Sequence, residues 1–106
     1  MSSEVPTCEW LGLRGNRYRF YIYRIGTRFS PVSGNYIYAR WTPNGWVPVK
    51  IGQSENLERR ISEHASQNLS FSGKGATHIH ARAEAPQESR HVIETDLLDY
   101  YGHHLE

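Results

Sequence analysis

Tyrosine, arginine and histidine side chains in the first two thirds of the chain have spacings that suit the binding of a phosphate group. Tyr36 and Tyr38 lie two positions apart in an aromatic run, so in a strand both would point to the same face. Arg60 and His64 would lie one turn apart on a helix, at the border of its apolar stripe. An arginine there can hold a phosphate with its planar fork, or it can simply cover apolar surface with its stem. The stripe consists of Leu57, Ile61 and Ala65.

A carboxylate stands in an unusual position in the last helix that the sequence predicts. Helical periodicity places Glu94 inside the apolar stripe that should face the core, whereas Asp96 and Asp99 fall outside it. Ionised carboxylates are rarely buried unless they are paired or bound to a cation. We therefore expect Glu94 to be either a partner of a half-buried arginine or a metal ligand or acid–base group.

The elements that would position these side chains form one α+β domain over residues 16–102. Residues 1–15 are expected to be irregular, and 103–106 are interpreted as a tail with a tag remnant. Strands are predicted at 16–25, 36–41, 46–51 and 76–85, and helices at 55–65 and 87–101. We therefore expect a small, mainly antiparallel sheet, with a three-stranded core and an extra N-terminal strand, flanked by helices.

Local signals support these boundaries. The Asn44-Gly45 pair predicts a hairpin turn, and Pro48 predicts an edge strand or a bulge nearby. Ser54 is the expected cap of the first helix, Pro86 can open the second, and Gly102 suits its end.

Composition fits a cytoplasmic protein. The chain has 106 residues and a single cysteine, Cys8, so no disulfide can form within it. It contains no apolar run long enough to cross a membrane and no signal-peptide pattern, so no membrane partner is expected. Residues 1–60 hold nine Lys and Arg against four Glu, whereas residues 61–106 hold three against seven acids. A basic half favours a polyanionic partner, although both halves can also be ordinary solvated surface. No oligomeric state is indicated.

Two motifs resemble the GIY-YIG nuclease family over about residues 31–101. Tyr36-Ile37-Tyr38, followed after eleven residues by Lys50-Ile51-Gly52, resembles the paired GIY and YIG strands. Arg60 lies eight residues beyond Gly52, as the family arginine does, and His64 occupies a position where the family often has histidine or tyrosine. The segment Ile93-Glu94-Thr95-Asp96-Leu97-Leu98 resembles the helix that carries the family's glutamate.

The resemblance implies an endonuclease that hydrolyses nucleic-acid phosphodiester bonds, DNA being favoured over RNA, with one Mg²⁺ or Mn²⁺ ion. Glu94 would hold the metal and Arg60 would stabilise charge on the phosphoryl oxygens. Tyr38 would orient or deprotonate water, and His64 would assist proton transfer. Tyr36 is the alternative to Tyr38, which its spacing favours. The candidates for substrate binding are Lys50, Gln53, Arg59 and Arg40.

Other interpretations remain open at this stage. Lys50 stands in place of the family tyrosine, and the position of the family asparagine is taken by Glu106, so a weak or inactive nucleic-acid-binding module is the alternative. The run 17–24 interleaves arginines with aromatics, which also suits nucleic-acid binding or a strand with an aromatic core face. A zinc site around His78 and His80 would lack the usual ligand spacings. A structural interaction domain would use Trp41 and Trp46 as an exposed contact, although such a pair more often pins a hairpin.

Overall fold

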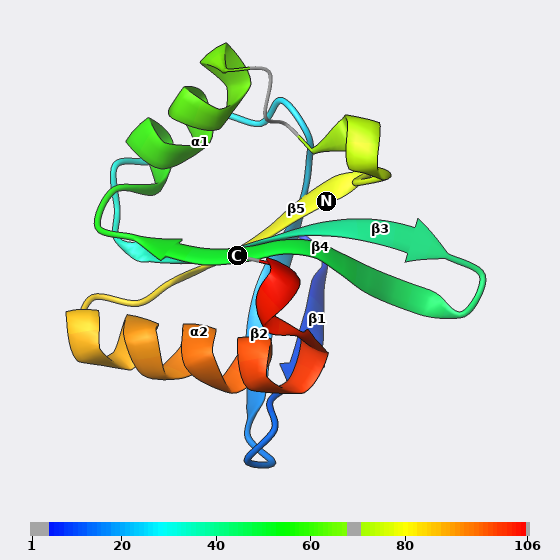
Figure 1. Cartoon of the computed structure of the whole chain (residues 1–106). Helices are drawn as coiled ribbons and strands as arrows, with labels where there is room; N and C mark the ends of the chain where they lie inside the picture. Colours follow the sequence, from blue (N-terminus) through cyan, green and yellow to red (C-terminus); the bar gives the residue numbers. More distant parts are fainter. Residues whose placement is uncertain (1–4, 68–70, 106) are drawn as a thin grey trace.

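A computed structural model describes residues 5–67 and 71–105, and shows one curled antiparallel sheet between two helices (Figure 1). The sheet has five strands in the order β1-β2-β5-β3-β4. Helix α1 covers one face and helix α2 covers the other. The α+β class and the mainly antiparallel sheet are confirmed, but the sheet extends further than the sequence indicates. The three-stranded unit β5-β3-β4 continues through β2 to β1.

The five strands all precede the last helix in the chain. Their bounds are β1 Thr7–Leu11, β2 Arg17–Arg24, β3 Gly34–Thr42, β4 Gly45–Ser54 and β5 His78–Ala83. Four of them match predicted strands. The first falls in the segment that we expected to be irregular, where Pro6 and Gly12 leave room for only a short strand.

The β3–β4 hairpin follows its sequence signals closely. Thr42 pairs with Gly45 around the turn, and Gly45 has a φ of 113°, which favours glycine. The register then shifts: Ala39 pairs with Pro48 and Tyr38 with Lys50, leaving Val49 as a β-bulge. The bulge lies on edge strand β4, as Pro48 predicts.

Both helices form where periodicity predicts them, with one different cap. Helix α1 spans Leu57–Ser66 and begins later than Ser54 would place it. Its cap is Asn56, whose side chain accepts a hydrogen bond from the Arg59 amide at 3.0 Å, while Ser54 hydrogen-bonds Asn56 instead. Helix α2 spans Gln87–Tyr101 and ends at Gly102.

The sheet separates two hydrophobic clusters. The α2 side buries residues from all the first four strands, and the α1 side buries Tyr36 and Tyr38 with the helix stripe of Leu57 and Ile61. The alternation in β3 explains this division, since Ile37 points to α2 while its two tyrosine neighbours point to α1. On the α2 side the cluster consists of Trp10, Tyr18, Phe20, Ile37, Ala39, Ile51, Ile93, Leu97 and Leu98.

Two details of the C-terminal part differ from expectation. Asp96, which the helical stripe left outside the core, is 1% exposed because the β1–β2 loop covers it. Tyr18 donates a hydrogen bond to it at 2.6 Å, and Arg14 donates from its amide and its guanidinium. The tail also contributes to the fold: His103–Leu105 forms a 3₁₀ turn, and Leu105 packs against the α2-side cluster.

Candidate active site

Tyr36 is the centre of the candidate site, and glycine makes room for it. Tyr36 in β3 pairs with Gly52 in β4, and its ring lies across that glycine. A Cβ at Gly52 would lie 2.5 Å from Cζ of Tyr36 and closer still to its hydroxyl oxygen. The absence of a side chain at Gly52 therefore lets Tyr36 reach across edge strand β4. The residue is only 1% exposed.

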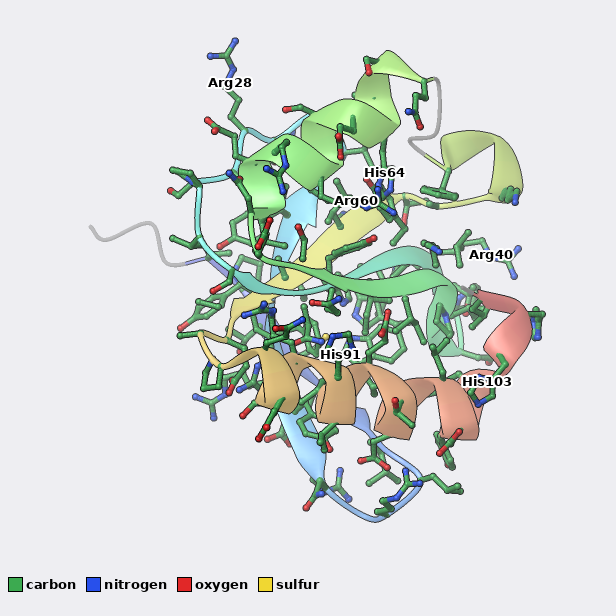
Figure 2. All side chains as sticks on the ribbon, turned by 60° about the vertical axis from the view of Figure 1, so that its left-hand side comes forward. Arg28, Arg40, Arg60, His64, His91 and His103 are labelled. Carbon is green, nitrogen blue, oxygen red and sulfur yellow. The ribbon has the colours of Figure 1, made fainter. Side chains whose placement is uncertain are left out.

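Arg60 lies on the α1 side of the sheet (Figure 2), and its guanidinium interacts with the Tyr36 hydroxyl. Its guanidinium donates a hydrogen bond to that hydroxyl, which raises the pKa of Arg60 above its ordinary value. The Arg60 side chain is 47% exposed, and its Nη1 lies 3.8 Å from a carboxylate oxygen of Glu63. Arg60 is thus held by the Tyr36 hydroxyl while nearly half of its side chain is open to solvent, from which a phosphate can approach.

Glu94 belongs to the other helix, yet its charge acts on the same hydroxyl. Burial raises the pKa of Tyr36, Arg60 opposes that rise, and the negative charge of Glu94 adds to it. Helix α2 packs mainly along edge strand β4, which is the strand that Tyr36 crosses at Gly52. The Glu94 side chain is 25% exposed and lies 3.9 Å from His91 Nδ1. It therefore lies at the rim of the buried stripe rather than inside it.

Tyr38 and His64 form a buried pair next to Tyr36. The Tyr38 hydroxyl lies 3.0 Å from His64 Nδ1, and their rings pack against Tyr36. Burial and then the charges of Arg60 and Lys50 lower the pKa of His64 to about 4, so the imidazole is neutral at pH 7. Burial, with a smaller contribution from Tyr36, raises the pKa of Tyr38, so its hydroxyl stays protonated and can donate to His64.

The candidates for substrate binding do not gather around one point. Lys50 pairs with Tyr38 across the hairpin, so it shares the α1 face, and its charge reaches His64. Gln53 instead accepts a hydrogen bond at its Oε1 from Nε of the buried Arg90, at 3.1 Å. Arg59 points to solvent and pairs with Glu55 at 3.0 Å. Arg40 is exposed further along β3, towards the hairpin turn (Figure 2).

The arrangement suits a metal that binds through few protein ligands. Mg²⁺ keeps several waters and commonly uses one or two carboxylates together with substrate phosphates. The partly exposed Glu94 carboxylate, close enough to act on the Tyr36 hydroxyl, fits that donor chemistry. Among the described residues there is no group of three or more His, Cys, Asp or Glu side chains that could hold a metal by themselves. His80, one of the zinc candidates, is fully buried and its Nδ1 accepts a hydrogen bond from Trp10 at 2.9 Å.

A pocket lies behind α1 rather than at the centre of the candidate site. Its volume is about 680 Å³, and it opens between α1 and the loop at 25–29. Tyr38 is the one candidate catalytic residue in its wall. No helix in the described part of the chain is long and apolar enough to cross a membrane.

Comparisons of this chain with protein families, with characterised proteins and with solved structures find no match. Any function must therefore be argued from the residues themselves. The site brings together Tyr36, Tyr38, Arg60, His64 and Lys50, with Glu94 acting across the sheet edge.

Sequence reasoning missed two residues that shape this site. Phe71 packs against Tyr38 and His64, with ring centroids 4.6 Å and 5.4 Å away. It lies in a polar loop, where no periodicity marks a ring that is packed and half-buried. Arg90 is 5% exposed and ties α2 to Gln53 of β4, one turn before Glu94. The only sequence signal for Arg90 is its position four residues before Glu94, which places both residues on the same side of the helix.

Proposed function

We propose that this chain is a metal-dependent phosphodiester hydrolase that acts on nucleic acid, with Tyr36, Arg60 and Glu94 at its centre. One observation supports the proposal above the others. A guanidinium and a carboxylate from helices on opposite faces of the sheet both act on a single tyrosine hydroxyl.

Arg60 is the charge-stabilising group in this proposal. Its guanidinium stays protonated, because its pKa is raised by the hydrogen bond to Tyr36. Almost half of the side chain is exposed, so N–H groups can reach a phosphoryl oxygen. A planar fork aimed at an oxygen whose charge grows in the transition state lowers the barrier.

Tyr36 is the proposed positioning donor for water or phosphate. Because Arg60 donates to its oxygen, the hydroxyl proton is directed elsewhere. Its raised pKa keeps that proton in place at neutral pH, so it acts as a hydrogen-bond donor and not as a phenolate base. We assign this role to Tyr36 rather than Tyr38, since the Tyr38 hydroxyl is already engaged by His64.

His64 contributes as a neutral imidazole. When Tyr38 donates to Nδ1, the ring proton lies on Nε2 and can be offered to a substrate oxygen. Lys50 adds a second positive charge on the same face. Glu94 is the residue that would hold a divalent metal, and such an ion would polarise the phosphate as a Lewis acid.

Cleavage of a fluorescently labelled DNA strand in the presence of Mg²⁺ or Mn²⁺ tests the proposal. We expect Glu94→Gln to reduce cleavage to background while the unfolding midpoint is retained. Arg60→Ala should lower the rate by about 100- to 1,000-fold. Glu88→Gln, on an exposed position of the same helix as Glu94, is the matched control and should cleave as wild type. Wild-type rates in Glu94→Gln would contradict the proposal.

A nucleic-acid-binding module without catalysis is the second candidate, and burial favours it. The exposed fractions of Tyr36, Tyr38 and His64 are 1%, 1% and 4%, so none of these side chains is open to solvent as a general base for catalysis. Such a module would bind the DNA strand equally well with and without the metal, and would leave it intact.

A further inference from the structure

Cationic side chains lie on both sides of the Phe71 ring, beginning with Lys50 and Arg60 at the candidate site. Lys50 pairs with Tyr38, whose hydroxyl lies 3.0 Å from His64 Nδ1, and Arg60 lies one turn before His64 on α1. Both cations therefore lie near that ring. Phe71 also packs against it, at 5.4 Å between ring centroids. The site therefore has an aromatic side wall next to these cations.

Phe71 is held in a conformation that few large residues adopt. Its φ is 64°, in the left-handed region that disfavours a residue with a bulky side chain. The rings of Tyr38 and His64 hold its side chain on the site side. The backbone conformation at Phe71 thus lets its ring line the site, and the residues that follow Phe71 lie next to the site.

The segment directly after Phe71 carries one further cation and contacts another. Lys74 is exposed, and its Nζ lies 5.8 Å from the centroid of the Phe71 ring. The next residue, Gly75, packs against Arg40, because a Cβ there would lie 3.0 Å from Arg40 Cδ. Arg40 is exposed, and it shares the α1 face with Tyr38 because it lies two positions further along β3.

These contacts form a continuous series from one pair of cations to another. It runs from Arg60 and Lys50 through His64 and Phe71 to a second group, Lys74 with Arg40. Figure 2 shows Arg60 and His64 between α1 and the sheet, with Arg40 further along the sheet. The acidic groups that face this series are Glu63 at Arg60 and Glu94 at Tyr36, both at the end where the reaction is proposed.

We propose that Lys74 and Arg40 form a second phosphate-binding position, so that the ligand is an extended nucleic-acid strand passing over Phe71. This inference rests on the proposed function, since it concerns the substrate of that site. Separated cations with an aromatic ring between them match the repeating phosphates and bases of a strand. A lone phosphate or a small phosphodiester would reach one of the two cation pairs only.

The test measures binding of a labelled single strand of about 12 nucleotides, and of a dinucleotide, without divalent metal at several salt concentrations. Neutralising one phosphate contributes about 0.7 to the slope of log affinity against log salt for a single strand. For the strand, the slope of log affinity against log salt should therefore be smaller by about 1.4 in Arg40→Ala/Lys74→Ala than in the wild type. Its dinucleotide affinity should be unchanged. Separate DNA and RNA strands show whether the sugar matters.

Arg28→Ala is the control, since it removes an exposed arginine from the loop at 25–29, outside this series of contacts. It should keep the wild-type slope, and circular dichroism should show both variants folded. A slope loss of about 0.7 in the control, an unchanged slope in Arg40→Ala/Lys74→Ala, or wild-type binding no tighter to the strand than to the dinucleotide would overturn the inference. Failure of cleavage would count against the proposed function alone, because the binding measurement needs no reaction.

Discussion

Gly52→Ala is a sensitive test of how Tyr36 is positioned. The added Cβ would lie 2.5 Å from Cζ of Tyr36, whereas ordinary carbon–carbon contacts are about 3.5 Å. The ring must therefore move by about 1 Å. It has little space for this, since Tyr38 and His64 pack against it with ring centroids 5.9 Å and 5.7 Å away.

The expected cost has two opposing parts. Overpacking a buried site costs about 1–3 kcal/mol. Replacing glycine by alanine within a strand returns about 0.5–1 kcal/mol, and Gly52 has no positive φ that alanine would strain. The net loss in unfolding free energy should be about 1–2 kcal/mol. If Tyr36 serves the reaction, a displacement of about 1 Å should also slow cleavage by about 100-fold.

Urea unfolding and DNA cleavage measure the two effects separately. Gly73→Ala is the matched control, because a Cβ at Gly73 meets nothing within 4 Å, and it should behave as wild type. In a Tyr36→Ala background the further change Gly52→Ala should cost nothing, since the ring is gone. A Gly52→Ala variant with wild-type stability and rate would refute the placement of Tyr36 across the glycine.

Three further outcomes are expected from the structure. Because burial lowers the pKa values of His64 and His80 to about 4, the unfolded chain binds more protons than the folded chain below about pH 6.5. Urea unfolding should therefore show the free energy of unfolding falling from about pH 6.5 towards about pH 4, by up to about 1.4 kcal/mol per pH unit for each histidine. His64→Phe should make this fall less steep. Asp96→Ala, which leaves buried Tyr18 without its acceptor, should cost about 2–4 kcal/mol in urea unfolding, and an unchanged midpoint would contradict the buried network. Arg60→Lys should recover little of the cleavage lost in Arg60→Ala, because an ammonium lacks the planar fork; full recovery would show that charge alone suffices.

The hairpin and the two helices are predictable from sequence because their signals are local. Asn44-Gly45 sets the turn, and the apolar repeats mark where in the chain each helix lies. The position of β5 between β2 and β3 is not predictable in this way, since it depends on pairing between residues far apart in the chain. Strand β1 was missed for the same reason: five residues carry little pattern, and its partner β2 supplies the pairing.

The candidate site shows the same division. Arg60, His64 and the tyrosines were found because strand and helix periodicities place them on known faces. The helical stripe of α2 was less reliable, because a helix can be covered from a second side. Asp96 is buried by the β1–β2 loop, which a helical pattern cannot anticipate, while Glu94 lies at the rim. Phe71 and Arg90 act through tertiary contacts alone.

The place of β5 also determines when the sheet can assemble during synthesis. The hairpins β1–β2 and β3–β4 share no hydrogen-bonded edge, because β5 pairs with a strand of each. A nascent chain that ends before His78 therefore holds two separate hairpins, each marginal in water by itself. The candidate catalytic groups of β3 and α1 are synthesised early, but the platform that orders them closes only when the strand at 78–83 inserts and α2 forms after it. Folding is thus governed by contacts distant along the chain, which predicts slow closure for so small a domain.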